Sequence, residues 1–224
     1  MKRAIRPTTE ARGAPEDVFA RHEPLHIRYA PDELIFQAGT YAAGVYLVVE
    51  GIVHESYVDA IAGGDPVSTG LYGPVSLIGV EMYLPGGEHL HRSSCRAVSQ
   101  VSLSFLEQND FEAALEMDEA LQSLLMAHYA QRGLLLARAV WRSQLDPAGR
   151  VQALLQDLAC LGRPIDGSRV ALPKEIDLHR VADLSYITYR KAKQLCRALD
   201  GAKWDGEQWL LAPEACMNAT SNSA

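Results

Sequence analysis

Between residues 25 and 105, apolar positions come in short runs, several of which alternate with polar positions. The runs are Leu25–Tyr29, Leu34–Phe36, Val45–Val49, Val53–Val58 and Ala97–Phe105. Glycines and the pair Pro31-Asp32 separate them. Short alternating segments divided by turn residues predict the strands of a β sandwich or small barrel. The preceding residues 1–23 are polar, and there we expect an irregular arm and a short helix near residues 17–21.

The pattern becomes helical from Gln108 onward, and the next proline is Pro147. Asp110 is expected to cap a short helix, and Asp118-Glu119 to begin a long one with negative charge at its amino end. Two apolar sets follow on neighbouring faces. One has heptad spacing and consists of Met126, Tyr129, Gly133, Leu136 and Val140; the other consists of Leu121, Leu124, Leu125, Leu135 and Ala139.

These two faces allow two interpretations of the long helix. One face can pack on the barrel and the other on a second copy of the chain, or both can be buried within a monomer. Gly133 in mid-helix costs about 1 kcal/mol relative to alanine. A close approach of a second helix at that point would explain the glycine, so we favour the dimer.

After Pro147 the pattern predicts three more helices and a hairpin. The first helix has an apolar face made of Val151, Leu154, Leu155, Leu158 and Ala159. A turn-rich link, 162–173, contains a short strand at Val170–Leu172. Two short helices then meet at the corner Ser185–Thr188, where Thr188 is expected to be the N-cap. Apolar runs on both sides of Asp205-Gly206 predict a hairpin, and a helix-turn-helix followed by a hairpin is a winged helix.

The last of these helices exposes a cationic face. After its apolar positions are assigned, the remaining side chains are Tyr189, Arg190, Lys193, Gln194 and Arg197, and no carboxylate lies between Thr188 and Ala198. Donors and cations without anions suit a polyanion with base edges. The alternative is an ordinary surface helix, since charge on a helix usually indicates only exposure to solvent.

Composition limits the possible classes of protein. The chain has 224 residues, of which 48% are hydrophobic, and no apolar run approaches the roughly 18 residues of a membrane span. We expect a cytoplasmic protein without a secretory signal, because no apolar segment follows the basic residues near the N-terminus. The four cysteines are scattered, which favours reduced thiols over disulfides or a zinc site.

The net charge of −7 does not exclude a nucleic-acid partner, because the acidic residues are concentrated in the first part of the chain. Residues 1–146 hold 11 basic and 19 acidic residues, whereas residues 147–213 hold 10 and 8. Neutralising phosphates is a short-range, salt-screened effect, so the local charge matters more than the total.

The segments Ile35–Thr40 and Val45–Gly51 resemble the glycine-punctuated strands of the CRP/FNR transcription regulators. The resemblance continues in order through Leu77–Glu81, Asp146–Val151 and 176–199. It implies an α+β fold: an N-terminal β jelly-roll (double-stranded β-helix) sensor domain at residues 1–107, a helical dimerisation segment at 108–146, a winged helix-turn-helix DNA-binding domain at 147–213 and a flexible tail at 214–224.

The resemblance also implies partners and residue roles. The partners are double-stranded DNA with a palindromic operator, a second copy of the chain and RNA polymerase, and no enzymatic activity is expected. Base-reading positions fall on Tyr189, Arg190 and Gln194, and backbone contacts on His179, Thr188 and Lys191, with Lys193 and Arg197 on the same face. The heptad set named above forms the dimer interface. The family usually has glycine at Tyr186 and glutamate at Arg190, so the operator should differ from the family consensus.

The effector pocket departs from that of the cyclic AMP receptors. Its candidate residues are Glu81, Arg92, Ser93, Leu135 and Leu136. In those receptors a glycine directly precedes the glutamate, whereas here Val80 separates Gly79 from Glu81. The position of the phosphate-binding arginine falls on His91, and Arg92 comes one residue later. In a strand, a shift of one residue reverses the direction of the side chain. Leucines cannot satisfy adenine, and an unsatisfied buried polar group costs about 1–3 kcal/mol. We therefore expect neither tight cyclic AMP binding nor a resident cofactor.

Three alternatives to this hypothesis remain open. The first is a cyclic-nucleotide receptor that uses Glu81 and Arg92. The second is a haem-based gas sensor whose candidate ligands are His22, His26, His54, His89, His91, His128 and Cys95. The iron–sulfur branch of the family is not expected, because it needs a cysteine cluster near the N-terminus and the first cysteine here is Cys95. The third is a metal-dependent jelly-roll enzyme that uses His89 and His91, but Tyr83, Cys95 and Arg96 stand where such enzymes need a glycine and a glutamate.

Overall fold

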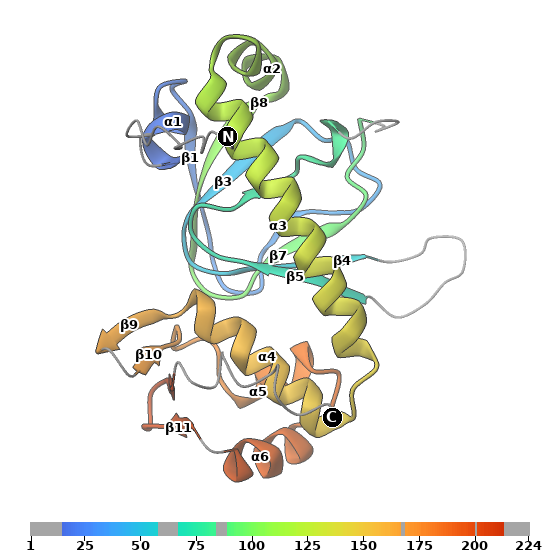
Figure 1. Ribbon diagram of the computed structural model, residues 1–224, viewed down its shortest axis with the longest axis vertical. Coiled ribbons are helices and arrows are strands. Elements are labelled where there is room, and N and C mark those ends of the chain that lie inside the picture. Colours follow the sequence, from blue (N-terminus) through green and yellow to red (C-terminus); the bar gives the residue numbers. More distant parts are fainter. Residues whose placement is uncertain (1–14, 58–66, 84–88, 167–168, 200, 213–224) are drawn as a thin grey trace, which may run out of the picture.

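A computed structural model describes residues 15–57, 67–83, 89–166, 169–199 and 201–212. A β sandwich forms one end of the molecule and a smaller helical unit with its own sheet forms the other, and one long helix runs along the sandwich towards the smaller unit (Figure 1). The predicted α+β fold is confirmed. The predicted arm at 1–14 and the tail at 214–224 lie outside the described residues.

Two four-stranded antiparallel sheets form the sandwich. Their orders are β1-β8-β3-β6 and β2-β7-β4-β5. The strands are β1 (Leu25–Tyr29), β2 (Leu34–Phe36), β3 (Gly44–Glu50), β4 (Val53–Tyr57), β5 (Val67–Tyr72), β6 (Leu77–Ile78), β7 (Ser94–Ala97) and β8 (Val101–Glu107). Residues from both sheets, among them Val48, Val53 and Leu103, meet in a shared apolar core, as expected for facing sheets.

One strand prediction is wrong. The run predicted as a single strand at 97–105 contains the end of β7, a turn, and most of β8. Ser99 holds this turn, because its Oγ accepts a hydrogen bond of 3.0 Å from the backbone N–H of Ile52. A turn held by a distant segment needs neither glycine nor proline, and its sequence therefore gives no turn signal.

Three helices and one 3₁₀ turn cover the sandwich. They are α1 (Pro15–Ala20), η1 (Glu81–Tyr83), α2 (Gln108–Met117) and α3 (Glu119–Ser143). The predicted start of α3 at Asp118-Glu119 is confirmed, and the Asp118 carboxylate caps the helix by accepting from the backbone N–H groups of Ala120 and Leu121. The cap predicted for α2 is wrong: the N-cap is Glu107, whose side chain makes no capping bond, and Asp110 lies in the first turn.

Helix α3 turns one stripe of side chains towards the sandwich. Along it the spacing alternates between four and three residues, through Leu121, Leu125, His128, Arg132, Leu135, Ala139 and Arg142. Leu121 and Leu125 pack against sandwich residues such as Val45 and Leu77 and against Phe19 and Phe111 of the shorter helices. The C-terminal part of the stripe includes three polar side chains, His128, Arg132 and Arg142, which lie between α3 and the sandwich.

The C-terminal unit consists of three helices and a third antiparallel sheet of order β11-β12-β10-β9. Its elements are α4 (Pro147–Leu161), β9 (Arg163–Asp166), β10 (Arg169–Ala171), α5 (Leu178–Leu184), α6 (Tyr189–Ala198), β11 (Ala202–Trp204) and β12 (Trp209–Leu211). The predicted helix-turn-helix and hairpin are therefore present as α5, α6, β11 and β12. Pro147 occupies the first turn of α4 behind an Asp146 N-cap, where its missing N–H costs nothing.

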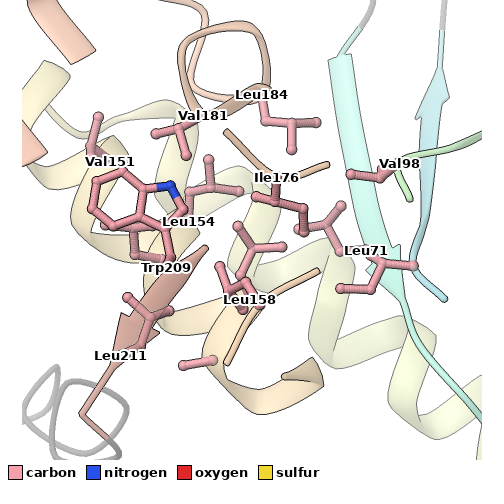
Figure 2. Packing of buried hydrophobic residues seen from close by; sticks show 14 of the residues in the cluster. Leu71, Val98, Val151, Leu154, Leu158, Ile176, Val181, Leu184, Trp209 and Leu211 are labelled. Atoms are coloured by element: carbon pink, nitrogen blue, oxygen red, sulfur yellow. The ribbon is translucent and has the colours of Figure 1, made fainter. Parts of the chain in front are cut away.

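The core of the C-terminal unit is continuous with the sandwich. Ile52, Leu71 and Val98 of the sandwich join residues of α4, α5 and β12 in one buried cluster, in which Leu158 and Trp209 lie (Figure 2). Near the end of α3, Arg142 Nη2 donates to Ser68 Oγ of β5 at 3.2 Å. The same arginine pairs with Asp157 of α4 at 2.6 Å. Apolar burial and a shared arginine therefore fix the C-terminal unit against the sandwich.

No helix in the described part of the chain is long and apolar enough to cross a membrane.

Candidate effector site and nucleic-acid interface

A cluster of buried charged side chains lies between the sandwich and α3. Glu55 points inward from β4, Glu81 begins η1, and Arg132 enters from α3. Arg132 Nη1 lies 2.9 Å from Glu55 Oε1 and 3.0 Å from Glu81 Oε1. Both carboxylate side chains are only 2% exposed and that of Arg132 is 14% exposed. One guanidinium nitrogen therefore bridges two carboxylates away from water.

Hydroxyl groups complete the surroundings of Glu55. Ser93 Oγ donates to Glu55 Oε1 at 2.7 Å, and Thr69 Oγ1 and Tyr72 OH donate to Oε2 at 2.8 and 3.1 Å. Burial disfavours the charged form of Glu55, but the charge of Arg132 and these hydrogen bonds outweigh it, and the pKa of Glu55 is lowered. Glu55 is the ionised member of the pair.

Glu81 has the opposite character. Its Oε1 lies 3.2 Å from Ser93 Oγ, and its buried Oε2 has no hydrogen-bond partner among the described residues. Burial, followed by the adjacent Glu55 carboxylate, raises the pKa of Glu81 to about 7. The Ser93 hydroxyl has a single proton and donates it to the nearer carboxylate, that of Glu55. A protonated Glu81 could instead donate to Ser93, so the pair can hold one shared proton near neutral pH.

His91 and His128 are buried and His54 is half-buried, and desolvation lowers the pKa of each to about 4. His54 forms a 2.9 Å hydrogen bond with Ser68, and His91 stacks on Phe36 with ring centroids 3.9 Å apart. His128 is 3% exposed, and neither of its ring nitrogens has a partner among the described residues. These imidazoles are neutral at neutral pH.

The metal-site candidates do not converge. His91 is buried, whereas His89 is exposed and contacts Gln108 at 3.2 Å. Within the described ranges, no three His, Cys, Asp or Glu side chains are grouped so that they could hold a metal ion. Cys95 is fully buried, and desolvation raises the pKa of its thiol.

The structure brings only part of the predicted effector pocket together. Glu81 and Ser93 meet, whereas Arg92 and Leu136 are exposed and Leu135 packs partly buried against the sandwich core. The sequence analysis missed Glu55 and Arg132. Two signals could have identified them: Glu55 shares the inward parity of Val53 on β4, and Arg132 lies four residues after His128 on the sandwich-facing stripe of α3.

The helix-turn-helix presents the predicted cationic face to solvent. Ala192 and Cys196 fix the inner side of α6 in the core, and the N-cap Thr188 accepts from the backbone N–H of Lys191 at 3.4 Å. The predicted contact residues that are exposed are His179, Thr188, Tyr189, Arg190, Lys191, Gln194 and Arg197, and Lys193 is half-buried. α6 lies at the end of the molecule remote from α1 and α2, where the sandwich does not cover it (Figure 1).

Two features fix the turn before α6 and the position of its first residue. Tyr186 occupies the corner with φ of 54°, the left-handed region that favours glycine, so the turn geometry is kept without the glycine usual in the family. The Tyr189 ring stacks on His179 of α5, with centroids 4.2 Å apart. This stack joins a predicted base-reading residue to a predicted backbone-contact residue.

The heptad face of α3 is largely uncovered. Met126 and Val140 are 66% and 61% exposed, Leu136 is exposed, and a Cβ added at Gly133 would meet nothing within 4 Å. Tyr129 is different, because its hydroxyl donates to the Val80 carbonyl at 3.1 Å and the ring turns partly towards the sandwich. Four of the five predicted interface positions thus lie on an open apolar surface.

Comparisons with known proteins agree with this arrangement. The sequence profile of the cyclic nucleotide-binding domain matches residues 26–118. FixK2 from Bradyrhizobium japonicum is similar in structure, with a TM-score of 0.69 and 18% identity over 90% of this chain and 99% of that chain. A cyclic nucleotide-binding domain containing protein from Listeria monocytogenes gives 0.72 and 13% over 91% and 99%.

A transcriptional regulator of the CRP/FNR family from Thermus thermophilus gives a TM-score of 0.58 and 18% identity over 86% of this chain and 98% of that chain. At these identities the likenesses establish the fold. No curated protein matches the sequence.

Proposed function

We infer that this chain, whose residues 26–118 belong to the cyclic nucleotide-binding domain family and which has the fold of the CRP/FNR transcription regulators, is a regulator that binds DNA. The observation that carries this inference is the outward cationic face of α6, which is free of carboxylates. In a helix-turn-helix the second helix enters the major groove by its N-terminal residues. Tyr189, Arg190 and Gln194 read bases, and Lys191 contacts phosphate.

We further propose that two copies act together on a palindromic operator. The open heptad face of α3 supports this, since a contiguous apolar surface on a helix calls for a partner. Two-fold symmetry would place the two α6 helices about 34 Å apart, one turn of DNA. Residues 1–107 then act as the sensor, 108–146 as the dimerisation segment and 147–213 as the DNA-binding domain, with RNA polymerase as the further partner.

Independence from cyclic AMP is also part of the proposal. The guanidinium of Arg132 already pairs with both carboxylates of the buried cluster between the sandwich and α3. A ligand with a cyclic phosphate would have to displace an internal ion pair. Calorimetric titration with cyclic AMP should therefore give no heat of binding at micromolar concentrations.

The direct test of function is selection of bound duplexes from a random pool, followed by footprinting in rising salt. We expect enrichment of an inverted repeat whose half-sites are one helical turn apart, and an affinity that falls steeply with salt. Sedimentation of the free protein measures its oligomeric state. Recovery of no preferred sequence would contradict the proposed function.

A further inference from the structure

The buried polar centre between the sandwich and α3, formed by Glu55, Glu81 and Arg132, favours a cation. Glu55 and Glu81 supply two carboxylates, and the groups that surround them are hydroxyls of Ser93, Thr69 and Tyr72. His128 lies beside Tyr72, with ring centroids 6.0 Å apart, and burial keeps it neutral. Arg132 is the cation that contacts both carboxylates. Without its side chain, the other groups named here would be two carboxylic acids and neutral groups.

A cyclic nucleotide does not fit this centre. With Arg132 displaced, its phosphate would meet the ionised Glu55 at close range in a region shielded from water, where like charges repel strongly. The ligand class that the domain family suggests therefore disagrees with the residues present.

The centre also has one hydrogen-bond acceptor that Arg132 does not contact. Both contacts of Arg132 use Nη1, whereas Glu81 Oε2 is buried without a partner among the described residues. A guanidinium carries five N–H donors in a planar fork, and it suits carboxylates in pairs. A guanidinium not tethered to α3 could reach the two atoms that Arg132 reaches and the free oxygen as well.

We propose that this buried polar centre is a guanidinium-binding site, and that Arg132 of the same chain is its resident ligand. An external effector of this site is a small guanidino compound that displaces Arg132, and cyclic phosphates are rejected. Because Arg132 lies on α3 next to Gly133, its displacement detaches the middle of α3 from β4 and η1. The effect of that release on DNA binding rests on the proposed function, whereas recognition of the guanidinium group does not.

Chemical rescue tests the site directly. Arg132→Ala should lower the unfolding temperature, and methylguanidinium at concentrations far below those that denature proteins should restore at least half of the loss in a saturable way. The wild type should respond only at higher methylguanidinium concentrations, because its tethered ligand has a high effective concentration and must be displaced. Arg138→Ala is the matched control: this arginine lies on the same helix but pairs with Asp157, and its side chain is 45% exposed.

The identity of the acceptors provides a second readout. In the Arg132→Ala background, Glu81→Gln should weaken methylguanidinium binding roughly tenfold by calorimetry, because it replaces one acceptor oxygen with an amide NH₂ group, which is only a donor. Cyclic AMP should not bind either variant. If Arg132→Ala folds only with methylguanidinium present, that result also supports the site. Arg132→Gln, which keeps an amide donor, is titrated in the same way if Arg132→Ala does not fold under any condition.

Three results would overturn the proposal: a response of Arg132→Ala no larger than that of Arg138→Ala, no effect of Glu81→Gln on methylguanidinium binding, or tighter binding of cyclic AMP than of methylguanidinium. A band-shift assay separates the two hypotheses. Saturable methylguanidinium binding by a protein that binds no DNA in any form would uphold the guanidinium site and refute the proposed function.

Discussion

Asp32 and Arg180 join the sandwich to the helix-turn-helix by an ion pair, with 2.6 Å between Asp32 Oδ1 and Arg180 Nη2. Asp32 lies in the turn between β1 and β2, and Arg180 lies on α5, directly after His179. The Arg180 side chain is 17% exposed and that of Asp32 is 62% exposed. This pair is the charged counterpart of the apolar contact that Ile52, Leu71 and Val98 make with the C-terminal unit.

A double-mutant cycle measures the strength of this pair. Asp32→Ala and Arg180→Ala should show a coupling energy of about 0.2–1 kcal/mol in urea unfolding, since solvent screens Asp32. The hydrogen bond from Arg180 lowers the pKa of Asp32, so the coupling is present at neutral pH and disappears as pH falls below the usual aspartate range. Lys174 and Glu207, a pair with both side chains more than half exposed, should give a smaller coupling.

The pH dependence of stability should identify Glu81. Its pKa is raised from 4.5 to about 7, so the folded state binds its proton more tightly than the unfolded state does. Stability therefore falls as pH rises from 4.5 through 7, by about 1–3 kcal/mol. Glu81→Gln should abolish this slope in urea unfolding, whereas Glu116→Gln, at an exposed position of α2, should keep it.

His54, His91 and His128 act in the opposite sense. Their pKa is lowered from 6.5 to about 4, so as pH falls through this interval the unfolded state binds protons that the folded state does not, and the stability of the folded state decreases. The slope of Glu81 must accordingly be taken as the difference between wild type and Glu81→Gln. An identical profile for both proteins would contradict the assignment of the raised pKa.

Arg190→Ala tests the predicted base contact. Removing a side chain that pairs with the O6/N7 edge of guanine should cost about 1–3 kcal/mol of DNA-binding free energy and relax the preference at one position of each half-site. Lys191→Ala should weaken binding to all sequences and reduce the salt dependence. Arg28→Ala, on an exposed position of β1, serves as the control without an effect. Equal losses on all sequences for Arg190→Ala would remove its base-reading role.

Gly133→Ala distinguishes the monomer from the dimer. In the single chain a Cβ at this position meets open space, so alanine should stabilise the isolated helix by about 1 kcal/mol. If a second α3 approaches closely there, the same methyl group weakens the dimer. Sedimentation equilibrium should show a higher dissociation constant alongside an unchanged or higher monomer stability. Gln131→Ala, an exposed position two residues earlier on α3, should leave the dissociation constant unchanged.

The sequence predicted those elements whose local pattern suffices. β3 and α3 are examples, because a glycine-bounded apolar run and an aspartate cap are local signals. β5 was not predicted, since Ser68, Thr69 and Gly70 interrupt its apolar pattern. The inward-facing residues of β5 are buried because α3 packs against this strand, and α3 lies far from β5 in the sequence.

The candidate site shows the same division. Glu81 and Ser93 could be found because a family resemblance places them, and the exposed face of α6 follows from helical spacing alone. The meeting of Glu55 with Arg132, 77 positions apart, could not be derived from either local pattern. A buried charge can be recognised in sequence by its place in an apolar stripe, but its partner cannot, because the pairing depends on how the helix crosses the sheet.

Ile52, Leu71 and Val98 are interior residues only while the C-terminal unit rests on them. If that unit were joined to a related sandwich, the three corresponding surface positions would need matching apolar side chains. Otherwise the apolar face of the C-terminal unit would pack poorly and leave a cavity at the junction. A C-terminal unit could therefore be exchanged between relatives only together with the sandwich residues on which it packs.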